Sequence, residues 1–322
     1  MLSTIYAAIV RRRRERYAAR PDLRRRLRHP VISIGNLAVG GRGKTPVTAY
    51  LAKTLIEMGE RPAILSRGYA RRQPGDGVVV VRDPDGIRAD LPRAGDEPLM
   101  LARQLPGACV LSASDRYLAG RLAELHLGAT IHLLDDGFQH LQLDRDVDLL
   151  IVGRDDIAHA ATLPAGRLRE PLDTMIAADA ILAADGEVVV EPAVASPPVF
   201  RLRRSPLPNP PDGRSALAIA GIAEPGRFFD DLRAAGWALA ETIAFRDHHP
   251  YSARDVDRIL QRAARAGAAR IVTTEKDMVR LLRFRPFVVP VVGVPFRMQP
   301  EPPDEFNAWL ADAIRSARDL HG

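Results

Sequence analysis

Apolar runs and amphipathic stretches alternate along residues 31–184. The apolar runs are VISI, AILS, GVVVV, ACVLSA, TIHLLDD, DLLIV and AILAA, and each is short and rich in aliphatic residues. Runs of this length predict buried strands, whereas GDEPLMLARQL and SDRYLAGRLAELHLG repeat their apolar positions at helical spacing. Strands that alternate with helices predict an α/β fold, in which a mostly parallel sheet carries helices on both faces.

The pattern changes after residue 187, where EVVVEPAVASPPVFRLRRSPLPNPPDGRS is dense in proline and β-branched residues. This composition is typical of an extended connection. A second, smaller α/β block follows over residues 216–293, and a last amphipathic helix is expected over residues 304–322. We therefore expect three parts, an N-terminal helix at residues 1–28, a nucleotide-binding domain at residues 29–195 and a smaller C-terminal α/β domain at residues 196–322.

The stretch AVGGRGKTP connects the first predicted strand to a helical stretch that we expect from Val47 to Gly59. A glycine-rich turn between a strand and a helix directs backbone N–H groups and the helix N-terminus at one point, where a phosphate chain binds. The usual pattern begins with glycine, and Ala38 stands there instead. That position opens the loop and does not touch the phosphates, so we still predict a P-loop nucleotide site.

Lysine usage supports the same interpretation. Of the 46 basic residues, only Lys44, Lys53 and Lys276 are lysines, and Lys44 occupies the loop position that reaches the β- and γ-phosphates. The hydroxyl of Thr45 is the expected ligand of a nucleotide-bound Mg²⁺. The predicted nucleotide-binding residues are Gly40, Gly41, Arg42, Gly43, Lys44, Thr45 and Pro46.

A second motif, TIHLLDDGFQH, delivers Asp135 and Asp136 to the carboxyl end of a predicted strand. An apolar strand that ends in aspartate is typical of a Walker B element, whose carboxylate holds Mg²⁺ directly or through water. The alternative is a solvated turn in which the aspartates cap a helix, and the upstream P-loop favours the magnesium site.

Three other polar clusters leave their alternatives open. RAGDEP places Asp96 and Glu97 in a loop before a helix that we expect to begin near Pro98, where they either cap the helix or orient and deprotonate an attacking hydroxyl. FRDHHPYS carries two histidines that are either exposed loop residues or ligands, although no Cys/His cluster at zinc spacing accompanies them. TTEKD places Lys276 after an apolar strand, where it is positioned to contact substrate or nucleotide.

Charge is concentrated at the N-terminus. The net charge is +6, and ten arginines fall between residues 11 and 28 against only Glu15 and Asp22. They follow the apolar start MLSTIYAAIV, so this segment predicts a helix that lies on a membrane surface with anionic lipids. Aromatic residues make up 5% of the chain, so stacking platforms for nucleic acid are not expected. The single cysteine, Cys109, excludes a disulfide framework and fits a reducing compartment.

Several motifs together resemble one known family. GNLAVGGRGKTP, SRGY, GDEP, DDGFQH, LPAGRLRE, DHHPYS and TTEKD occur in the order found in the tetraacyldisaccharide 4'-kinases of lipid A biosynthesis, and they span most of the chain. That family also lacks the first P-loop glycine. The resemblance implies a P-loop domain joined by an extended hinge to a smaller α/β domain. It also implies transfer of a phosphoryl group from ATP to the 4'-hydroxyl of a tetraacylated glucosamine disaccharide 1-phosphate, which gives lipid IVA.

The resemblance assigns roles to individual residues. It implies that Lys44 and Thr45 hold the phosphates and Mg²⁺, and that Asp96 is the catalytic base, paired with His248. The carboxylates implied around the metal and the reacting phosphate are Glu97, Asp135, Asp136 and Glu170. Arg67 and Arg116 are weaker candidates for contacts with the charged sugar head group.

The expected partners follow from this reaction. They are the acylated disaccharide lipid and the cytoplasmic face of the bacterial inner membrane, with no nucleic acid and no obligate protein partner. The main alternative is a membrane-associated switch ATPase of the partitioning type, whose loop also reads G-G-x-G-K-T. Those ATPases carry a lysine before the two glycines where this sequence has Val39, and they give DDGFQH and DHHPYS no role.

Overall fold

The computed structural model describes residues 1–322 except 41–42, 69–76, 185–196 and 321–322. The chain forms two compact units. The larger unit comprises Met1–Arg203 together with Met298–Gly322, and the smaller unit is the insert Arg204–Arg297.

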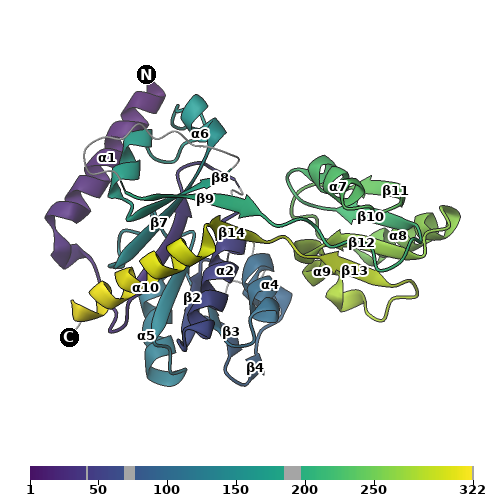
Figure 1. Ribbon diagram of the computed structural model, residues 1–322, viewed down its shortest axis with the longest axis horizontal. Helices are drawn as coiled ribbons and strands as arrows, with labels where there is room; N and C mark the ends of the chain where they lie inside the picture. Colours follow the sequence, from purple (N-terminus) through teal and green to yellow (C-terminus); the bar gives the residue numbers. More distant parts are fainter. Residues whose placement is uncertain (41–42, 69–76, 185–196, 321–322) are drawn as a thin grey trace. The chain divides into compact units, whose positions relative to one another are not determined.

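A ten-stranded sheet forms the centre of the larger unit, in the order β14-β9-β8-β7-β1-β6-β2-β5-β3-β4 (Figure 1). The seven strands from β9 to β5 in this order run parallel to their neighbours, and β3 is antiparallel to both β5 and β4. The strands are β1 (Val31–Asn36), β2 (Pro62–Ser66), β3 (Val79–Asp83), β4 (Gly86–Ile87), β5 (Cys109–Ser112), β6 (Ile131–Asp135), β7 (Val147–Gly153), β8 (Ala180–Ala184), β9 (Val199–Arg204) and β14 (Met298–Glu301).

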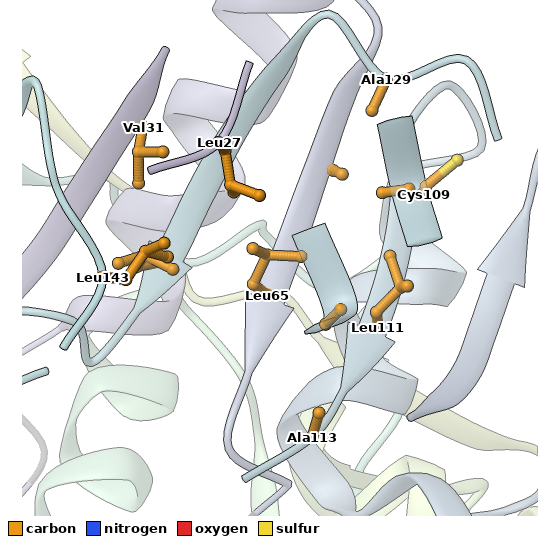
Figure 2. Close-up of a cluster of buried hydrophobic side chains, with 12 residues drawn as sticks. Leu27, Val31, Leu65, Cys109, Leu111, Ala113, Ala129 and Leu143 are labelled. Atoms are coloured by element: carbon orange, nitrogen blue, oxygen red, sulfur yellow. The ribbon is translucent and has the colours of Figure 1, made fainter. Parts of the chain in front are cut away.

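Helices pack along this sheet and bury apolar side chains against it. Helix α2 lies against β1, β6 and β2, while α5 lies against β2 and β5. One buried cluster includes Leu65, Leu111 and Leu143 from the sheet side and Ala119 and Ala123 from α5 (Figure 2). The helices of this unit are α1 (Leu2–Ala19), α2 (Lys44–Glu57), α3 (Leu91–Ala94), α4 (Asp96–Gln104), α5 (Arg116–His126), α6 (Arg154–Ala158) and α10 (Pro303–Asp319). The predicted fold class, a mostly parallel α/β sheet of the P-loop type, is confirmed.

The predicted domain boundaries are wrong at two places. Val199–Arg204, which the prediction assigned to the smaller domain, form β9, and β9 pairs in parallel with β8 as a strand of the large sheet. The chain end also belongs to the larger unit, since α10 buries its apolar face there. The Phe306 ring packs edge-on against Phe200 at 5.1 Å between centroids, and Tyr50 lies 6.3 Å away. These aromatic contacts explain why the last helix folds on the first domain rather than with the insert.

The N-terminal helix is shorter than the predicted 1–28. Helix α1 ends at Ala19, a short 3₁₀ turn follows over Pro21–Leu23, and the next residues lie against the large unit. Leu27 is 2% exposed in the buried cluster of Figure 2, and a Cβ on Gly120 would come within 2.3 Å of its Cδ1. Only α1 is therefore a peripheral element, because the segment after it contributes to the core.

The smaller unit is a second parallel α/β sheet with the order β11-β10-β12-β13. One buried cluster around Phe228 and Trp237 and another around Tyr251 and Ile259 supply its own core. Its strands and helices are β10 (Ala216–Ala220), α7 (Pro225–Ala234), β11 (Leu239–Ala244), α8 (Ala253–Arg265), β12 (Arg270–Thr274), α9 (Glu275–Leu281) and β13 (Val291–Val294).

Candidate nucleotide and phosphoryl-transfer site

The glycine loop lies at the carboxyl end of β1, which is flanked in the sheet by β6 and β7. Gly40 and Gly43 have φ values of 109° and 84°, a region that favours glycine, and Gly43 caps α2. The helix begins at Lys44 and not at the predicted Val47, so Lys44, Thr45 and Pro46 form its first turn. First-turn N–H groups have no partner within the helix, and a proline there removes none that the helix uses. The predicted residues Gly41 and Arg42 lie outside the described residues.

The Lys44 ammonium lies among oxygen acceptors. Its Nζ donates to Asn36 Oδ1 at 3.0 Å and to the Gly40 carbonyl at 3.2 Å, and it lies 3.6 Å from Asp136 Oδ1. Burial lowers the pKa of Lys44, and the Asp136 carboxylate opposes that shift. A compact cation at the mouth of a glycine loop stabilises the charge of a nucleotide β- and γ-phosphate.

Asp136 is held by a second cation, Arg169. The guanidinium contacts both carboxylate oxygens, at 3.0 and 3.2 Å, and donates to Asn36 Oδ1 as well. Burial disfavours the ionised form of Asp136, but the charges of Lys44 and Arg169 outweigh it and hold the pKa of this carboxyl below its usual value. Asn36 Oδ1 is thus a shared acceptor for the lysine and the arginine, and Asp136 is the anion between them.

Asp135 is in a different electrostatic environment. It ends β6, is buried, and accepts a hydrogen bond at 3.1 Å from the Thr48 hydroxyl of α2. Burial, followed by the negative charges of Asp136 and Glu97, raises the pKa of Asp135 to about 7. The structure therefore brings three predicted carboxylates together, and negative charge gathers beside the first turn of α2.

Glu97 on α4 lies close enough to Asp135 to raise the pKa of that carboxyl, and Asp96 precedes Glu97 at the start of the same helix. The prediction that they lie in a loop before a helix at Pro98 is wrong, because α4 begins at Asp96 and its N-cap is Gly95, with a φ of 88°. Asp96 is 8% exposed. A carboxylate in the first turn of a helix is stabilised in its ionised form by the N–H groups there.

Arginines line another part of the same sheet edge. Burial and the charge of Arg67 lower the pKa of Arg116 to about 10, while Asp136 and Asp135 oppose the shift. Arg116 is the first residue of α5, and Arg67 follows β2. These two cations are therefore close enough to one another and to the aspartates to interact electrostatically.

Two predicted residues have other surroundings. Glu170 is buried, and Arg14 of α1 binds both of its carboxylate oxygens, at 2.8 and 3.1 Å. The same guanidinium lies 4.4 Å above the Phe138 ring. His248 belongs to the smaller unit, so the predicted site residues come from both units.

Sequence reasoning gave no role to Asn36, Arg169 or Gln139, although each lies in a quoted motif. Gln139 donates to the Asn36 backbone carbonyl at 3.0 Å and so braces the end of β1. The only available signal was their presence in GNLAVGGRGKTP, LPAGRLRE and DDGFQH. Their partners are distant in sequence, so no local pattern reveals the contacts.

A glycine loop with its lysine after a central parallel strand, and paired aspartates at the end of the neighbouring strand, define a P-loop nucleotide-binding protein. The profile of the family described as "Tetraacyldisaccharide-1-P 4'-kinase" matches residues 1–315. The chain belongs to this family of kinases.

Individual relatives agree with the family assignment. The tetraacyldisaccharide 4'-kinase of Geobacter sulfurreducens is 38% identical and covers 96% of this chain and 90% of its own length. That of Koribacter versatilis is 40% identical over 91% of each chain. A crystal structure of LpxK from Aquifex aeolicus in complex with ATP superposes with a TM-score of 0.81 at 31% identity, over 97% of both chains.

Proposed function

We propose that this protein transfers the γ-phosphoryl group of ATP to the 4'-hydroxyl of a tetraacylated glucosamine disaccharide 1-phosphate and so forms lipid IVA. The family assignment provides the reaction class, and the relative from Aquifex aeolicus was crystallised with ATP. The observation that carries the proposal is the arrangement of Lys44, Asp136 and Arg169 around Asn36 at the mouth of the glycine loop. This arrangement places fixed charges where phosphoryl transfer needs them.

The loop residues bind and orient the nucleotide. Gly40, Gly43 and the first turn of α2 offer backbone N–H groups to the phosphates, and Lys44 neutralises charge on them. Arg169 and Asn36 keep Asp136 and Lys44 in place, so the site needs little rearrangement when the phosphate charge shifts during transfer. The switch-ATPase alternative does not fit the family assignment.

The donor set at the carboxylate cluster fits Mg²⁺. A hydroxyl on Thr45 and carboxylates on Asp135, Asp136 and Glu97 are hard oxygen ligands. Burial first, and then the negative charges of Asp136 and Glu97, raise the pKa of Asp135, and a bound cation would offset those charges. Among the described residues, no group of three or more His, Cys, Asp or Glu side chains could hold a metal ion. The proposed ion therefore needs the Thr45 hydroxyl and the nucleotide phosphates as further ligands. Mg²⁺ bound there would neutralise phosphate charge. Thr45 and Asp135 are its proposed ligands. Glu170, which the resemblance also placed around the metal, is bonded to Arg14.

Asp96 is the proposed general base and His248 its partner. A carboxylate at the start of α4 accepts the proton of the sugar hydroxyl as the hydroxyl attacks, and the imidazole orients and stabilises that carboxylate. Arg67 and Arg116 are proposed to contact the anionic head group of the acceptor.

The acceptor carries four acyl chains, so the protein must work at a lipid surface. Among the described residues, no helix has both the length and the apolar character that crossing a bilayer needs. On α1, however, Leu2, Ile5 and Ile9 are 70%, 52% and 63% exposed, while Arg14 of the same helix is bonded to the domain. We assign α1 as a peripheral anchor on the cytoplasmic face of the inner membrane, where its apolar side enters the lipid and its arginines meet anionic head groups.

The anchor is tested by vesicle sedimentation. The triple variant Leu2→Ser, Ile5→Ser, Ile9→Ser keeps the Arg14 contact and should lose most binding to anionic vesicles. A matched control replaces Leu118 and Leu125, which are 50% and 63% exposed on α5, and should bind as the parent does. High salt should weaken binding of the parent protein. Equal binding by the triple variant would move the lipid contact to another surface.

One assay tests the reaction itself. The protein is incubated with labelled ATP and Mg²⁺, with or without the acylated disaccharide 1-phosphate, and the label is followed into lipid. Transfer to the lipid and near-idle hydrolysis without it are expected, because the base acts on the sugar hydroxyl. Rapid ATP hydrolysis that ignores the acceptor would instead favour the switch ATPase.

A further inference from the structure

One face of α1 is bonded to the segment 162–170, which precedes β8 in the chain. The Tyr6 hydroxyl donates to the Arg169 carbonyl at 3.1 Å, and the Ser3 carbonyl accepts from the Thr162 hydroxyl at 3.0 Å. The half-buried residues of α1 recur at helical spacing and include Ser3, Tyr6, Val10, Arg14 and Tyr17. The side of α1 away from the proposed lipid contact is therefore docked on the larger unit.

This segment continues into the phosphate site. The Arg169 N–H donates to the Leu37 carbonyl at 2.6 Å, and the Val39 N–H donates to the Arg167 carbonyl at 2.8 Å. These backbone bonds lie where the glycine loop begins. The guanidinium of Arg169 is also the cation that binds both carboxylate oxygens of Asp136. A shift of the segment would therefore move a charge of the site and the start of the loop together.

Arg14 connects the segment to the loop that carries Asp136. Its guanidinium donates to both carboxylate oxygens of Glu170, which is the residue after Arg169. It also donates to the carbonyl of Phe138, two residues after Asp136, at 3.3 Å. The Glu170 side chain is only 3% exposed, so its charge depends on the arginine. One side chain of α1 thus holds the residues that flank the two partners of the ion pair.

The backbone of Asp136 requires such support. Its φ is 59°, in the left-handed region that is disfavoured for residues other than glycine. A conformation of this kind persists where the surroundings hold it. The next residue, Gly137, donates its N–H to the Ile34 carbonyl of β1 at 2.9 Å, and Phe138 is fully buried. Arg14 adds a bond at the Phe138 carbonyl, on the side of the loop that faces α1.

We propose that Arg14 is a positioning residue for phosphoryl transfer, because it holds Arg169 and Asp136 against one another and through them holds Lys44 at the phosphates. The inference rests on the proposed function, in which Lys44 binds the nucleotide. Glu170 then acts as the acceptor for Arg14 and not as a ligand of the metal. The helix that we assign to the lipid surface is also a support of the phosphate site.

The test uses variants of the full chain. Arg14→Met alone would leave Glu170 charged and buried, so the main variant is the double variant Arg14→Met, Glu170→Gln. The matched control is Arg103→Met, at an exposed arginine in the last turn of α4. Because the chain has only three lysines, NMR of labelled lysine side chains resolves Lys44, and Lys44→Ala identifies its signal. Spectra are recorded without lipid, nucleotide or Mg²⁺, so neither anchoring nor metal binding affects them.

The double variant should shift the Lys44 signal and lower kcat/KM for ATP at least about tenfold. The signals of Lys53, which is exposed on α2, and of Lys276, in the smaller unit, should stay in place. Arg14→Lys keeps a cation at this position and should show smaller changes, and Arg103→Met should match the parent protein. An unmoved Lys44 signal in the double variant overturns the proposal, and so does a parent value of kcat/KM.

The same measurements separate this inference from the proposed function. If Lys44→Ala keeps the parent rate, the P-loop assignment is wrong, and the proposed role of Arg14 is wrong with it. If Lys44→Ala loses transfer while the double variant keeps the parent rate and the parent Lys44 signal, only the inference about Arg14 is overturned. Loss of transfer with an unmoved Lys44 signal also overturns it, because Glu170 would then act at the metal itself.

Discussion

At the scale of single residues, the site depends on charges that hold one another in place. Lys44 and Arg169 share the Asn36 side-chain oxygen, and both face Asp136. Asp135, one residue earlier, is paired with a neutral hydroxyl, and its pKa is raised where that of Asp136 is lowered. The two adjacent aspartates therefore differ in pKa, because Asp136 faces two cations whereas Asp135 is buried beside a neutral hydroxyl.

The P-loop lysine gives the first prediction. Lys44→Ala should lower kcat/KM by at least about 100-fold, because a preorganised charge at the phosphates is lost. Lys53→Ala is the control, since Lys53 lies on the same helix with its side chain 74% exposed. Phosphoryl transfer to the lipid acceptor is measured for both. Near-normal transfer by a folded Lys44→Ala protein would refute the assignment of the loop.

The proposed pair gives the second prediction. Asp96→Asn should abolish transfer while nucleotide binding persists, because the carboxylate acts on the acceptor hydroxyl. His248→Ala should be milder, and the double variant should lose less than the sum of the two losses in activation free energy. The measurement is kcat for the four proteins of the cycle. Strict additivity would show that Asp96 and His248 do not act as a unit.

Residues in local motifs could be placed from the sequence, whereas contacts between distant residues could not. Lys44, Asp135 and Asp136 follow apolar strands in local motifs, so their position at one sheet edge could be predicted. Arg169 lies 33 residues from Asp136. Their ion pair could not be predicted from the sequence, because it depends on where the loop before β8 lies in the folded chain. Glu170 lies in a motif that resembles the family, but its partner could not be predicted. Its bond to Arg14 forms only because α1 packs against the larger unit.

At the scale of elements, polar contacts of one side chain, Glu124, attach the N-terminal segment to the sheet. Glu124 of α5 accepts from the backbone N–H groups of Arg28 and His29, at 2.7 and 3.0 Å, and lies 3.2 Å from His132 Nε2 in β6. Burial raises the pKa of Glu124, but these donors and Arg121 outweigh it and lower the pKa to about 2. The Glu124 carboxylate thus connects the segment before β1, helix α5 and strand β6.

This carboxylate gives a prediction about pH. A depressed pKa in the folded state stabilises the protein above the unfolded value near 4.5, and the contribution is lost as pH falls toward 2. Glu124→Gln should therefore lower the free energy of unfolding at pH 7 by roughly 1–3 kcal/mol. The gap should narrow between pH 4.5 and 2. Urea denaturation of both proteins across this range is the measurement, and a gap independent of pH would contradict it.

Elements also explain the error in the domain boundaries. The amphipathic pattern of α10 correctly predicted a helix, but an apolar face does not indicate which part of the protein it packs against. That partner includes Phe200 on β9, more than one hundred residues earlier, and β9 itself follows a proline-rich stretch that reads as a connection. Non-local packing of this kind leaves no periodic signal in the sequence.

At the scale of the whole molecule, the smaller unit has the features of an independent domain. It has its own four-stranded parallel sheet and two buried clusters drawn from its own residues. We predict that residues 204–297 expressed alone give a cooperative thermal transition and dispersed NMR signals. A chain that stays unfolded under native conditions would show that the larger unit is needed for its stability.

The two ends of that insert are adjacent. Ser205 N–H donates to the Arg297 carbonyl at 3.0 Å, β9 pairs with β14, and Arg203 forms an ion pair with Glu301 at 2.9 Å. A stretch of gene that begins and ends at neighbouring strands can be gained or lost in one recombination event, because a short turn closes the gap without moving any strand. In a chain shortened in this way, β14 and α10 would still belong to the larger unit. Such a chain would keep the phosphate-binding loop and lose His248, the proposed partner of the base, together with the insert.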